Sequence, residues 1–449
     1  MNLVSYFKGY FPYYRRNLKI AFPVMFAQLG QAIVMLADTI MVGHLGTIEL
    51  AAVSFGTAIF MIGFLFALGL SIGATPLIGK EYAAGGHRRS AIIFQNSILF
   101  DLVISFVLGV IMWGVSCYMD CMGQPDEVWP LAQTYFRISV YSLPFVLLFQ
   151  SFRQFMEGIG NTKYAMIITL VGNLFNIFLN WLLIFGKLGC PMLGVAGAAY
   201  ATLISRILMS IAFVILFFVK KPLVRYFYFF GKKSFSKKEI KSLAYVGVPI
   251  GSQMLLESLG MSLASIMVGW FGAVALASHQ IAMNLSSLTF MISGGLASAT
   301  TIRVSHQIGV KNFKSMRKAG IASTHLSLLF SFVCALILFL FRNEIASIFT
   351  IDSDVLHLSS LLIAIVALYQ FGDGYQVVSI GALRGMSDVY PPMIVAIVCY
   401  LFVNLSLAYI FAVLLDWGVV GVWVAFMIEL YLAAILLGIR FHYKTKRYR

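Results

Sequence analysis

The sequence predicts an all-α polytopic membrane protein with twelve transmembrane helices in two pseudo-symmetric six-helix bundles. Of its 449 residues, 60% are hydrophobic and 11% are charged, and the mean hydropathy is +0.91. This balance is typical of a chain that crosses a bilayer many times. The apolar residues gather in long runs, and the first half of the chain recurs in modified form in the second half. Composition, run length and repeat therefore indicate the same fold class.

Twelve apolar runs, six in each half, have the roughly 20 residues that a membrane-spanning helix needs. We expect the spans at residues 18–42, 52–78, 92–116, 131–155, 165–186, 196–219, 243–270, 277–302, 319–341, 356–382, 392–415 and 419–440. The stretch between the halves is rich in lysine and aromatic residues, which is typical of a segment at the membrane surface. The sequence thus predicts an N-terminal six-helix bundle, a basic cytoplasmic interfacial linker and a C-terminal six-helix bundle, over residues 1–219, 220–241 and 242–449.

The repeat has a constant spacing. Pro23 and Gly43 recur as Pro249 and Gly269, 226 residues later (249 − 23 = 226), and both glycines belong to the pattern IMVGxxGxxxLA. Because six spans return the chain to its starting side, both copies have the same orientation, which predicts a symmetry axis along the membrane normal. Transporters of this design place their site between the halves, near the midplane. Duplicated packing without transport is the alternative.

Charge predicts the orientation. The chain has 32 Lys and Arg against 17 Asp and Glu, a net charge of +15, and the basic residues crowd both termini and alternate connections between spans. The positive-inside rule then places both termini in the cytoplasm of a multi-pass protein of the bacterial inner (plasma) membrane. Since these charges border apolar runs, we expect anionic lipid headgroups as partners, and no nucleic acid. The five cysteines lack metal-ligand spacing and fit small buried hydrophobes.

Two acids in the second half are candidates for a cation site. Glu257 lies in a predicted span and shares a helical face with Gln253 and Met261, and Tyr369 shares a face with Asp373 four residues on. Carboxylate and phenol oxygens are ligands of hard cations such as Na⁺. The same two acids could instead hold H⁺, because burial and a neighbouring carboxylate both favour protonation. The alternative is that each acid is a structural polar group paired with backbone or arginine.

The first half carries a different polar group. Asp38 lies inside an apolar helix, where an ionisable residue is a functional candidate by default. Asn173, Asn176 and Asn180 follow at i, i+3 and i+7, so they form one stripe whose amides could orient a carboxyl group. For Asn173 and Asn180, hydrogen bonding between packed spans is the alternative.

A substrate cavity needs additional lining residues. Helical spacing puts Gln280 and Asn284 on one face of the eighth span. The chain contains 39 Phe, 21 Tyr and 21 Met, and those near an acid would suit flat organic cations through cation–π and thioether contacts. The expected cavity residues are Asn173, Gln253, Met261, Gln280 and Asn284.

Several features are absent or have no assigned role. The sequence has no G-x-x-x-x-G-K-[ST] loop, no H-E-x-x-H motif and no G-x-S-x-G elbow, so we expect neither direct ATP drive nor an enzyme activity. We expect no bound cofactor, only Na⁺ or H⁺ as the coupling ion. Asp101, Arg206 and Glu429 also lie within predicted spans, and the sequence assigns them no function.

Longer motifs resemble a known family. The stretches ADTIMVGHLG, SLASIMVGWFG, SHQIAMNL and QFGDGYQVVSIGALRG, together with the repeat over nearly the whole chain, resemble the multidrug and toxic compound extrusion (MATE) transporters, in particular the NorM-like branch. The resemblance implies twelve spans in two six-helix bundles around a V-shaped cavity. It also implies alternating-access antiport, with export of cationic amphipathic drugs and other toxic organic compounds driven by inward flow of Na⁺ or H⁺.

The resemblance also implies site residues, by position. Glu257, Asp373 and Tyr369 match the cation site of the family's second bundle, which makes them the Na⁺ candidates. The residues that match the site of its first bundle are Asp38, Asn176 and Asn180. The DinF-like branch usually lacks the pair equivalent to Glu257 and Asp373, so this chain departs from that branch, which favours Na⁺ as the coupling ion.

Competing functions remain at this point. A lipid or lipid-linked oligosaccharide flippase of the same superfamily is the nearest alternative, although such a protein should line its groove with cationic residues for phosphate. An intramembrane enzyme lacks a nucleophile and base pair. For the transporter we expect a monomer acting on cationic organic small molecules.

Overall fold

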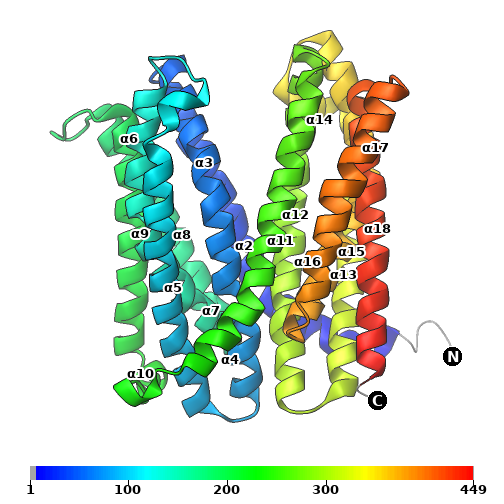
Figure 1. The fold of residues 1–449 in the computed structure, drawn as a ribbon. Coiled ribbons are helices and arrows are strands. Elements are labelled where there is room, and N and C mark those ends of the chain that lie inside the picture. Colours follow the sequence, from blue (N-terminus) through cyan, green and yellow to red (C-terminus); the bar gives the residue numbers. More distant parts are fainter. Residues whose placement is uncertain (1–6, 448–449) are drawn as a thin grey trace. The chain divides into compact units, whose positions relative to one another are not determined.

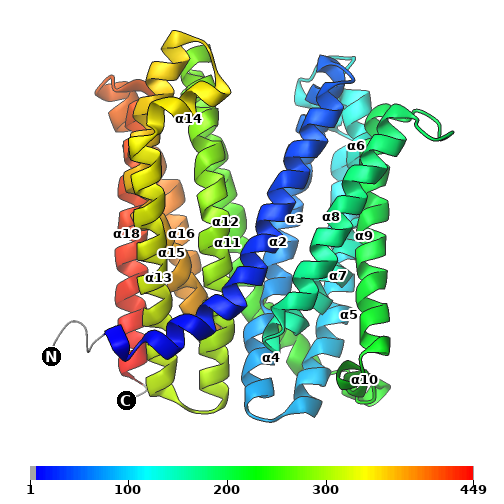
Figure 2. The ribbon, with the colours of Figure 1, turned by 180° about the vertical axis from the view of Figure 1, so that it is seen from behind.

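The structure is a computed structural model, and it describes residues 7–447. The described chain is helical and divides into two compact units (Figures 1 and 2). The helices of the N-terminal half are α2 (Phe11–Gly43), α3 (Thr47–Ile72), α4 (Ala74–Ala83), α5 (His87–Ser116), η1 (Met119–Met122), α6 (Trp129–Tyr141), α7 (Leu143–Gly158), α8 (Thr162–Phe185) and α9 (Gly194–Val219). The linker contains α10 (Lys221–Phe227) and η2 (Lys232–Ser234). The C-terminal half contains α11 (Lys237–Gly269), α12 (Ala273–Gly309), α13 (Phe313–Leu340), α14 (Arg342–Phe349), α15 (Ser353–Gly385), α16 (Tyr390–Ala396), the π-helix η3 (Ile397–Asn404), α17 (Leu405–Tyr409), the π-helix η4 (Ile410–Leu414) and α18 (Gly418–Lys446).

Each of the twelve predicted spans falls on helical structure. Within residues 7–447, ten helical segments are long and apolar enough to cross a membrane. The other two predicted spans correspond to α11 and to the pair α6 and α7. The chain is therefore a multi-pass α-helical membrane protein, as its composition predicts.

Proline and glycine divide some of the spans. The span predicted at 131–155 is two helices because Pro144, near the start of α7, cannot continue the hydrogen-bond ladder of α6. The helix pair α3 and α4 joins at Gly73, with Pro76 close behind. In the span predicted at 392–415 the helix widens twice into π-helical turns, a feature that proteins often place at functional sites.

The two compact units differ from the predicted domains. Unit 1 comprises residues 1–25 and 252–449, and unit 2 comprises residues 26–251. Each unit thus contains the first part of the helix that begins the other half, so the boundaries expected at 219 and 242 do not mark the ends of compact units. The exchange follows the repeat, because the two boundaries lie 226 residues apart (251 − 25 = 226). In each case a helix-interior proline, Pro23 or Pro249, lies two residues before the last residue of the exchanged segment.

Small residues allow the exchanged segment of α11 to pack closely in unit 2. A Cβ added to Gly69 of α3 would lie 2.3 Å from Cα of Gly251, and one added to Gly73 would lie 2.8 Å from Cα of Gly247. Two glycine pairs with four-residue spacing therefore face each other, the arrangement that lets membrane helices approach backbone to backbone. In unit 1 the corresponding contact brings Gly295 of α12 against Met25 of α2.

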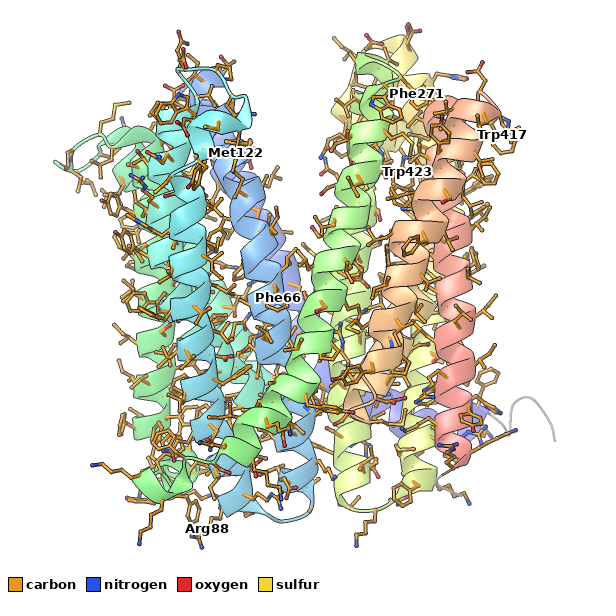
Figure 3. The ribbon with its side chains drawn as sticks, viewed as in Figure 1. Phe66, Arg88, Met122, Phe271, Trp417 and Trp423 are labelled. Atoms are coloured by element: carbon orange, nitrogen blue, oxygen red, sulfur yellow. The ribbon has the colours of Figure 1, made fainter. Side chains whose placement is uncertain are left out.

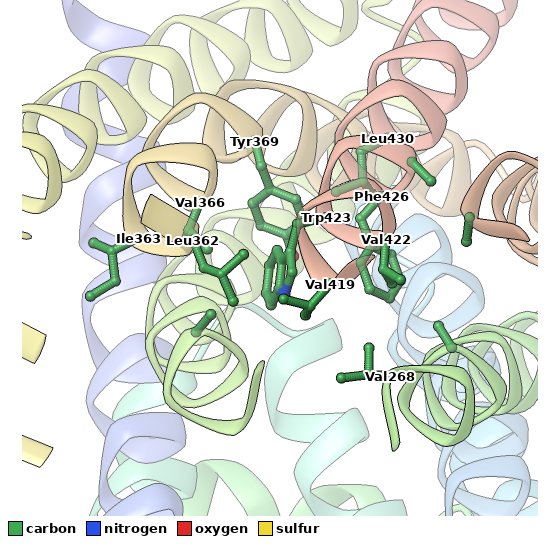
Figure 4. Packing of buried hydrophobic residues seen from close by; sticks show 14 of the residues in the cluster. Val268, Leu362, Ile363, Val366, Tyr369, Val419, Val422, Trp423, Phe426 and Leu430 are labelled. Carbon is green, nitrogen blue, oxygen red and sulfur yellow. The ribbon is translucent and has the colours of Figure 1, made fainter. Parts of the chain in front are cut away.

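Each unit has its own apolar core. In unit 1, Tyr369, Trp423 and Phe426 pack with aliphatic residues of α11, α15 and α18 (Figure 4). In unit 2 a cluster of stacked and edge-on phenylalanines includes Phe94 and Phe155, whose ring centroids lie 4.3 Å apart. Between membrane helices, this tight packing stabilises the bundle where water cannot.

The two ends of unit 1 have different chemistry. Phe271 and Trp417 lie at one end, whereas α12 joins α13 at the other (Figures 1 and 3). Near the latter end Asp388, in the α15–α16 connection, accepts two hydrogen bonds from Arg440, at 2.8 and 3.0 Å, and one from Lys444 at 3.3 Å. Burial raises the pKa of Asp388, but these hydrogen bonds and positive charges outweigh burial and lower the pKa below its usual value.

Candidate functional site

A buried hydrogen-bonded chain in unit 1 ends on the first predicted acid. Gln253 is 2% exposed. Its amide donates to Oε1 of Glu257 at 2.9 Å, and its amide oxygen accepts from Nη2 of Arg384 at 3.2 Å. Gln253 therefore links an arginine of α15 to the carboxylate of α11 and orients that carboxylate from below by one helical turn.

The second predicted acid lies on α15 beside this chain. Asp373 is 4% exposed, and its charge interacts with that of Glu257. Tyr369, one turn earlier, is buried and exchanges a hydrogen bond of 2.6 Å with the hydroxyl of Ser286. Its ring packs edge-on against Trp423 at a centroid distance of 6.0 Å (Figure 4). The structure thus brings together the three residues that the sequence predicts for the second-half site.

A third carboxyl group belongs to the same cluster. Glu429 of α18 is 0% exposed, and neither of its carboxyl oxygens has a hydrogen-bond partner in the described chain. Its charge interacts with those of Glu257 and Asp373. Opposite it, the π-helix η3 supplies the buried Tyr400, whose hydroxyl accepts a hydrogen bond of 2.7 Å from Gln376. A buried carboxylate without partners is costly, so this position needs a neutralising positive charge.

The charges of the unit 1 cluster do not balance. Glu257, Asp373 and Glu429 could together carry three negative charges, and Arg384 is the one basic residue of the described chain whose charge interacts with theirs. No group of three or more His, Cys, Asp and Glu side chains within residues 7–447 is arranged to hold a metal ion. A cation bound here would therefore use two carboxylates at most, together with neutral oxygens such as the Tyr369 hydroxyl.

Unit 2 holds the first-half group. Nδ2 of Asn180 donates a short hydrogen bond to Oδ1 of Asp38, and also donates to Oδ1 of Asn176 at 3.1 Å. Asn176 and Asn180 are buried, with Asn180 fully so. The structure therefore brings these three predicted residues together, whereas Asn173 lies outside the network, and its amide nitrogen is buried without a partner in the described chain.

Asp38 has a basic neighbour that the sequence did not reveal. The charge of Arg206, on α9, interacts with that of Asp38 and with Tyr135. The guanidinium lies 5.3 and 5.6 Å from the ring centroids of Phe60 and Phe64 and donates a short hydrogen bond to Ser142. In unit 2 one acid thus has one basic partner.

The predicted cavity residues have different environments. Gln280 and Asn284 are exposed on the same side of α12, as helical spacing predicts. Gln253, in contrast, is buried in the hydrogen-bonded chain, because its amide bridges two charged groups. Met261 packs at the margin of the apolar core of unit 1. These last two residues therefore support the site from within unit 1 and do not line an open surface.

Residues that sequence reasoning did not select complete both clusters. Arg384, Glu429 and Arg206 are charged residues inside apolar runs, so their composition alone marks them as candidates. No periodicity indicates their partners, which come from other helices. Asp101 shows the limit of that signal, because it is buried and accepts hydrogen bonds from Ser71 and Ser151, away from either cluster.

Comparison with known proteins identifies the family. A family model described as MatE matches residues 23–182 and 249–410. The chain is 32% identical over 431 residues to the multidrug resistance protein NorM of Photobacterium profundum, covering 95% of this chain and 94% of that protein. It is 33% identical over 437 residues to a probable multidrug resistance protein NorM of Pasteurella multocida, with 95% and 93% covered. The chain therefore belongs to the MATE (MatE) transporter family, and the predicted NorM-like resemblance is confirmed.

Solved structures share the fold. A structure described as the outward-facing conformation of a multidrug resistance MATE family transporter of the MOP superfamily has a TM-score of 0.88 and 24% identity, covering 97% of this chain and 96% of that chain. The two segments that match the family model begin 226 residues apart (249 − 23 = 226). The duplication inferred from the sequence is therefore confirmed, and so is its spacing.

Proposed function

We propose that this protein is a cation-coupled antiporter that exports cationic amphipathic organic compounds, with Na⁺ or H⁺ flowing inward through the acidic cluster of unit 1. The printed names of its relatives, multidrug resistance proteins, support the class of substrate. The observation that carries the proposal is the excess negative charge of Glu257, Asp373 and Glu429 over Arg384. A buried cluster of this kind is stabilised by taking up a positive charge.

Charge uptake at this position can be coupled to movement. Glu257 lies on α11, Asp373 on α15 and Glu429 on α18. A bound cation reduces the repulsion between these helices and favours the conformation in which they lie close together, whereas an empty cluster favours separation. A coupling ion shifts such an equilibrium only through its differential affinity for the two conformations. The proposed location is a bacterial inner membrane, with both termini cytoplasmic as the distribution of basic residues predicts.

Uptake of a fluorescent organic cation into proteoliposomes tests the proposal. An imposed Na⁺ gradient at fixed pH, with choline replacing Na⁺ in the control, and a separate pH gradient without Na⁺ distinguish the two coupling ions. We expect one of these gradients to drive flux in the wild type, and neither to drive it in Glu257→Gln or Asp373→Asn. The matched control is Glu344→Gln, which removes an exposed acid outside the cluster.

Two results would overturn the proposal. Wild-type flux in both Glu257→Gln and Asp373→Asn would exclude the acidic cluster as the coupling site. Scrambling of labelled lipid, without gradient-driven flux of organic cations, would instead favour the flippase alternative.

A further inference from the structure

The outer surface of unit 1 contains a groove that the transport cycle does not use. It lies along α13, α15 and α18, and its volume is about 700 Å³, within the range of about 300–1,000 Å³ that small-molecule sites typically have. Its walls are almost entirely apolar and include Phe371, Tyr431, Ile435 and Ile439. In a membrane-spanning unit these exposed apolar side chains are suited to hydrocarbon.

Glycines create this groove. Gly372 of α15 lies against α18, where an added Cβ would be 3.2 Å from the backbone nitrogen of Tyr431. Gly438 of α18 lies against Tyr375, whose hydroxyl would be 2.6 Å from an added Cβ. Both glycines line the groove. The two helices therefore pack closely there, and the missing side chains leave a channel along their junction.

The charged groups of the groove are basic and lie at one end. His442 and Lys446, near the end of α18, line the groove. Arg317 of α13 donates to Nδ1 of His442 at 3.2 Å. The neighbouring Arg440 and Lys444 are already paired with Asp388, so they do not provide the free positive charge. No acid lines the groove.

We infer that this groove binds an anionic phospholipid of the bilayer, with an acyl chain along α15 and α18 and the phosphate at Arg317 and Lys446. The charge distribution supports this occupant, because a chain-shaped apolar channel ends in cationic groups at the helix ends, where lipid phosphates lie. A cationic drug would meet only positive charge. A free phosphate ion would leave the apolar channel unfilled.

The position of the groove connects it to the acidic cluster. Phe371, Gly372 and Tyr375 face the groove, whereas Tyr369 and Asp373 are buried on the other side of the same helical turns. A lipid that fills the groove would hold α15 against α18, which carries Glu429. We therefore expect the bound lipid to promote cation uptake, and only this last step depends on the proposed function.

Lipid binding can be measured without transport. Dioleoyl phosphatidylglycerol is titrated into the purified protein in a zwitterionic detergent, and the retained lipid is counted by native mass spectrometry. We expect Arg317→Gln/Lys446→Gln to weaken binding by about 30-fold, because each basic residue contributes on the order of fivefold near an anionic lipid surface. Lys311→Gln/Lys314→Gln removes the same charge from exposed positions outside the groove, and should bind like the wild type.

Photocrosslinking locates the occupant. A benzophenone amino acid at Ile439, which is 62% exposed in the groove, should capture phosphatidylglycerol in preference to phosphatidylcholine. The same probe at Phe402, 65% exposed on the span that contains η3, should show no preference. Ile435→Trp fills the groove from its rim without altering the helix junction, and should reduce capture at Ile439.

Each contrary outcome overturns the inference. Equal binding of phosphatidylcholine, or unchanged binding by Arg317→Gln/Lys446→Gln, would mean that the groove does not select an anionic lipid. Equal competition by glycerol phosphate would indicate an anion site without a role for the acyl chain. Loss of flux with lipid selectivity intact would count against the proposed function and leave the lipid site unaffected.

Discussion

The two units carry related scaffolds but opposite charge balances. In unit 2, Asp38 has Arg206 as a partner and Asn180 as a hydrogen-bond donor. In unit 1, Glu257, Asp373 and Glu429 share Arg384. A balanced pair can remain ionised without an added ion, whereas an excess of buried acids requires one. The duplication therefore preserved the helices while concentrating cation demand in one copy.

The largest expected effect comes from removing an acid in each unit. Asp373→Asn should abolish the response of flux to either cation gradient, a decrease of roughly 100-fold or more if coupling depends on this carboxylate. Asp38→Asn should change the rate but keep the gradient dependence, because Arg206 already balances that acid. Initial rates in proteoliposomes measure both. The contrast between the units disappears if the two variants behave alike.

The next effect concerns the balanced pair. Arg206→Gln leaves Asp38 without its basic neighbour, and breaking a buried ion pair in this way costs about 3 kcal/mol. We expect a thermal midpoint several degrees lower in detergent. The double variant Arg206→Gln/Asp38→Asn should recover part of that loss, since no unpaired charge remains. A double variant no more stable than Arg206→Gln would indicate that the two groups do not interact.

Close packing provides a smaller contrast. In Gly69→Ala the new methyl group would meet the backbone of Gly251, whereas in Gly295→Ala the nearest atom, at 2.4 Å, is the flexible Met25 side chain. We expect Gly69→Ala to destabilise the protein by about 2 kcal/mol, and Gly295→Ala by less. Gly109→Ala, whose nearest neighbour is at 4.0 Å, is the control. Thermal unfolding ranks the three variants, and the reverse order for the first two would contradict this account.

The smallest effect depends on pH. The pKa of Asp388 is lowered in the folded protein, so its ion pairs contribute fully above the unfolded value of about 3.9 and are lost as pH falls through the folded value. Asp388→Asn should therefore lower the thermal midpoint near neutral pH, by the equivalent of about 1 kcal/mol. Its difference from the wild type should shrink below about pH 4. A difference that is independent of pH would rule out the ion pairs as its cause.

The sequence predicts the helices better than their partners. Run lengths and the 226-residue spacing define the spans because hydropathy and periodicity are local properties. The exchange of the first parts of α2 and α11 between units is a tertiary arrangement, for which Pro23 and Pro249 are only a hint. For the same reason the predicted domains ended at the linker, and not within those helices.

The sites show the same division. Helical spacing correctly placed Tyr369 beside Asp373 and grouped Asn176 with Asn180, because these residues are on one helix. It could not pair Asp38 with Arg206 or bring Glu429 to Glu257, since these contacts join helices distant in sequence. Gln253 was expected in a cavity because it is polar, yet its amide is used to join two buried charges.

Charge movement on a supported membrane tests the central claim most directly. Proteoliposomes receive a step in Na⁺ concentration, or in pH, without any organic substrate, and the transient current reports cation uptake alone. We predict a transient in the wild type and in Asp38→Asn, and none in Asp373→Asn. A transient of wild-type size in Asp373→Asn, with none in Asp38→Asn, would place the cation site in unit 2 and contradict the account.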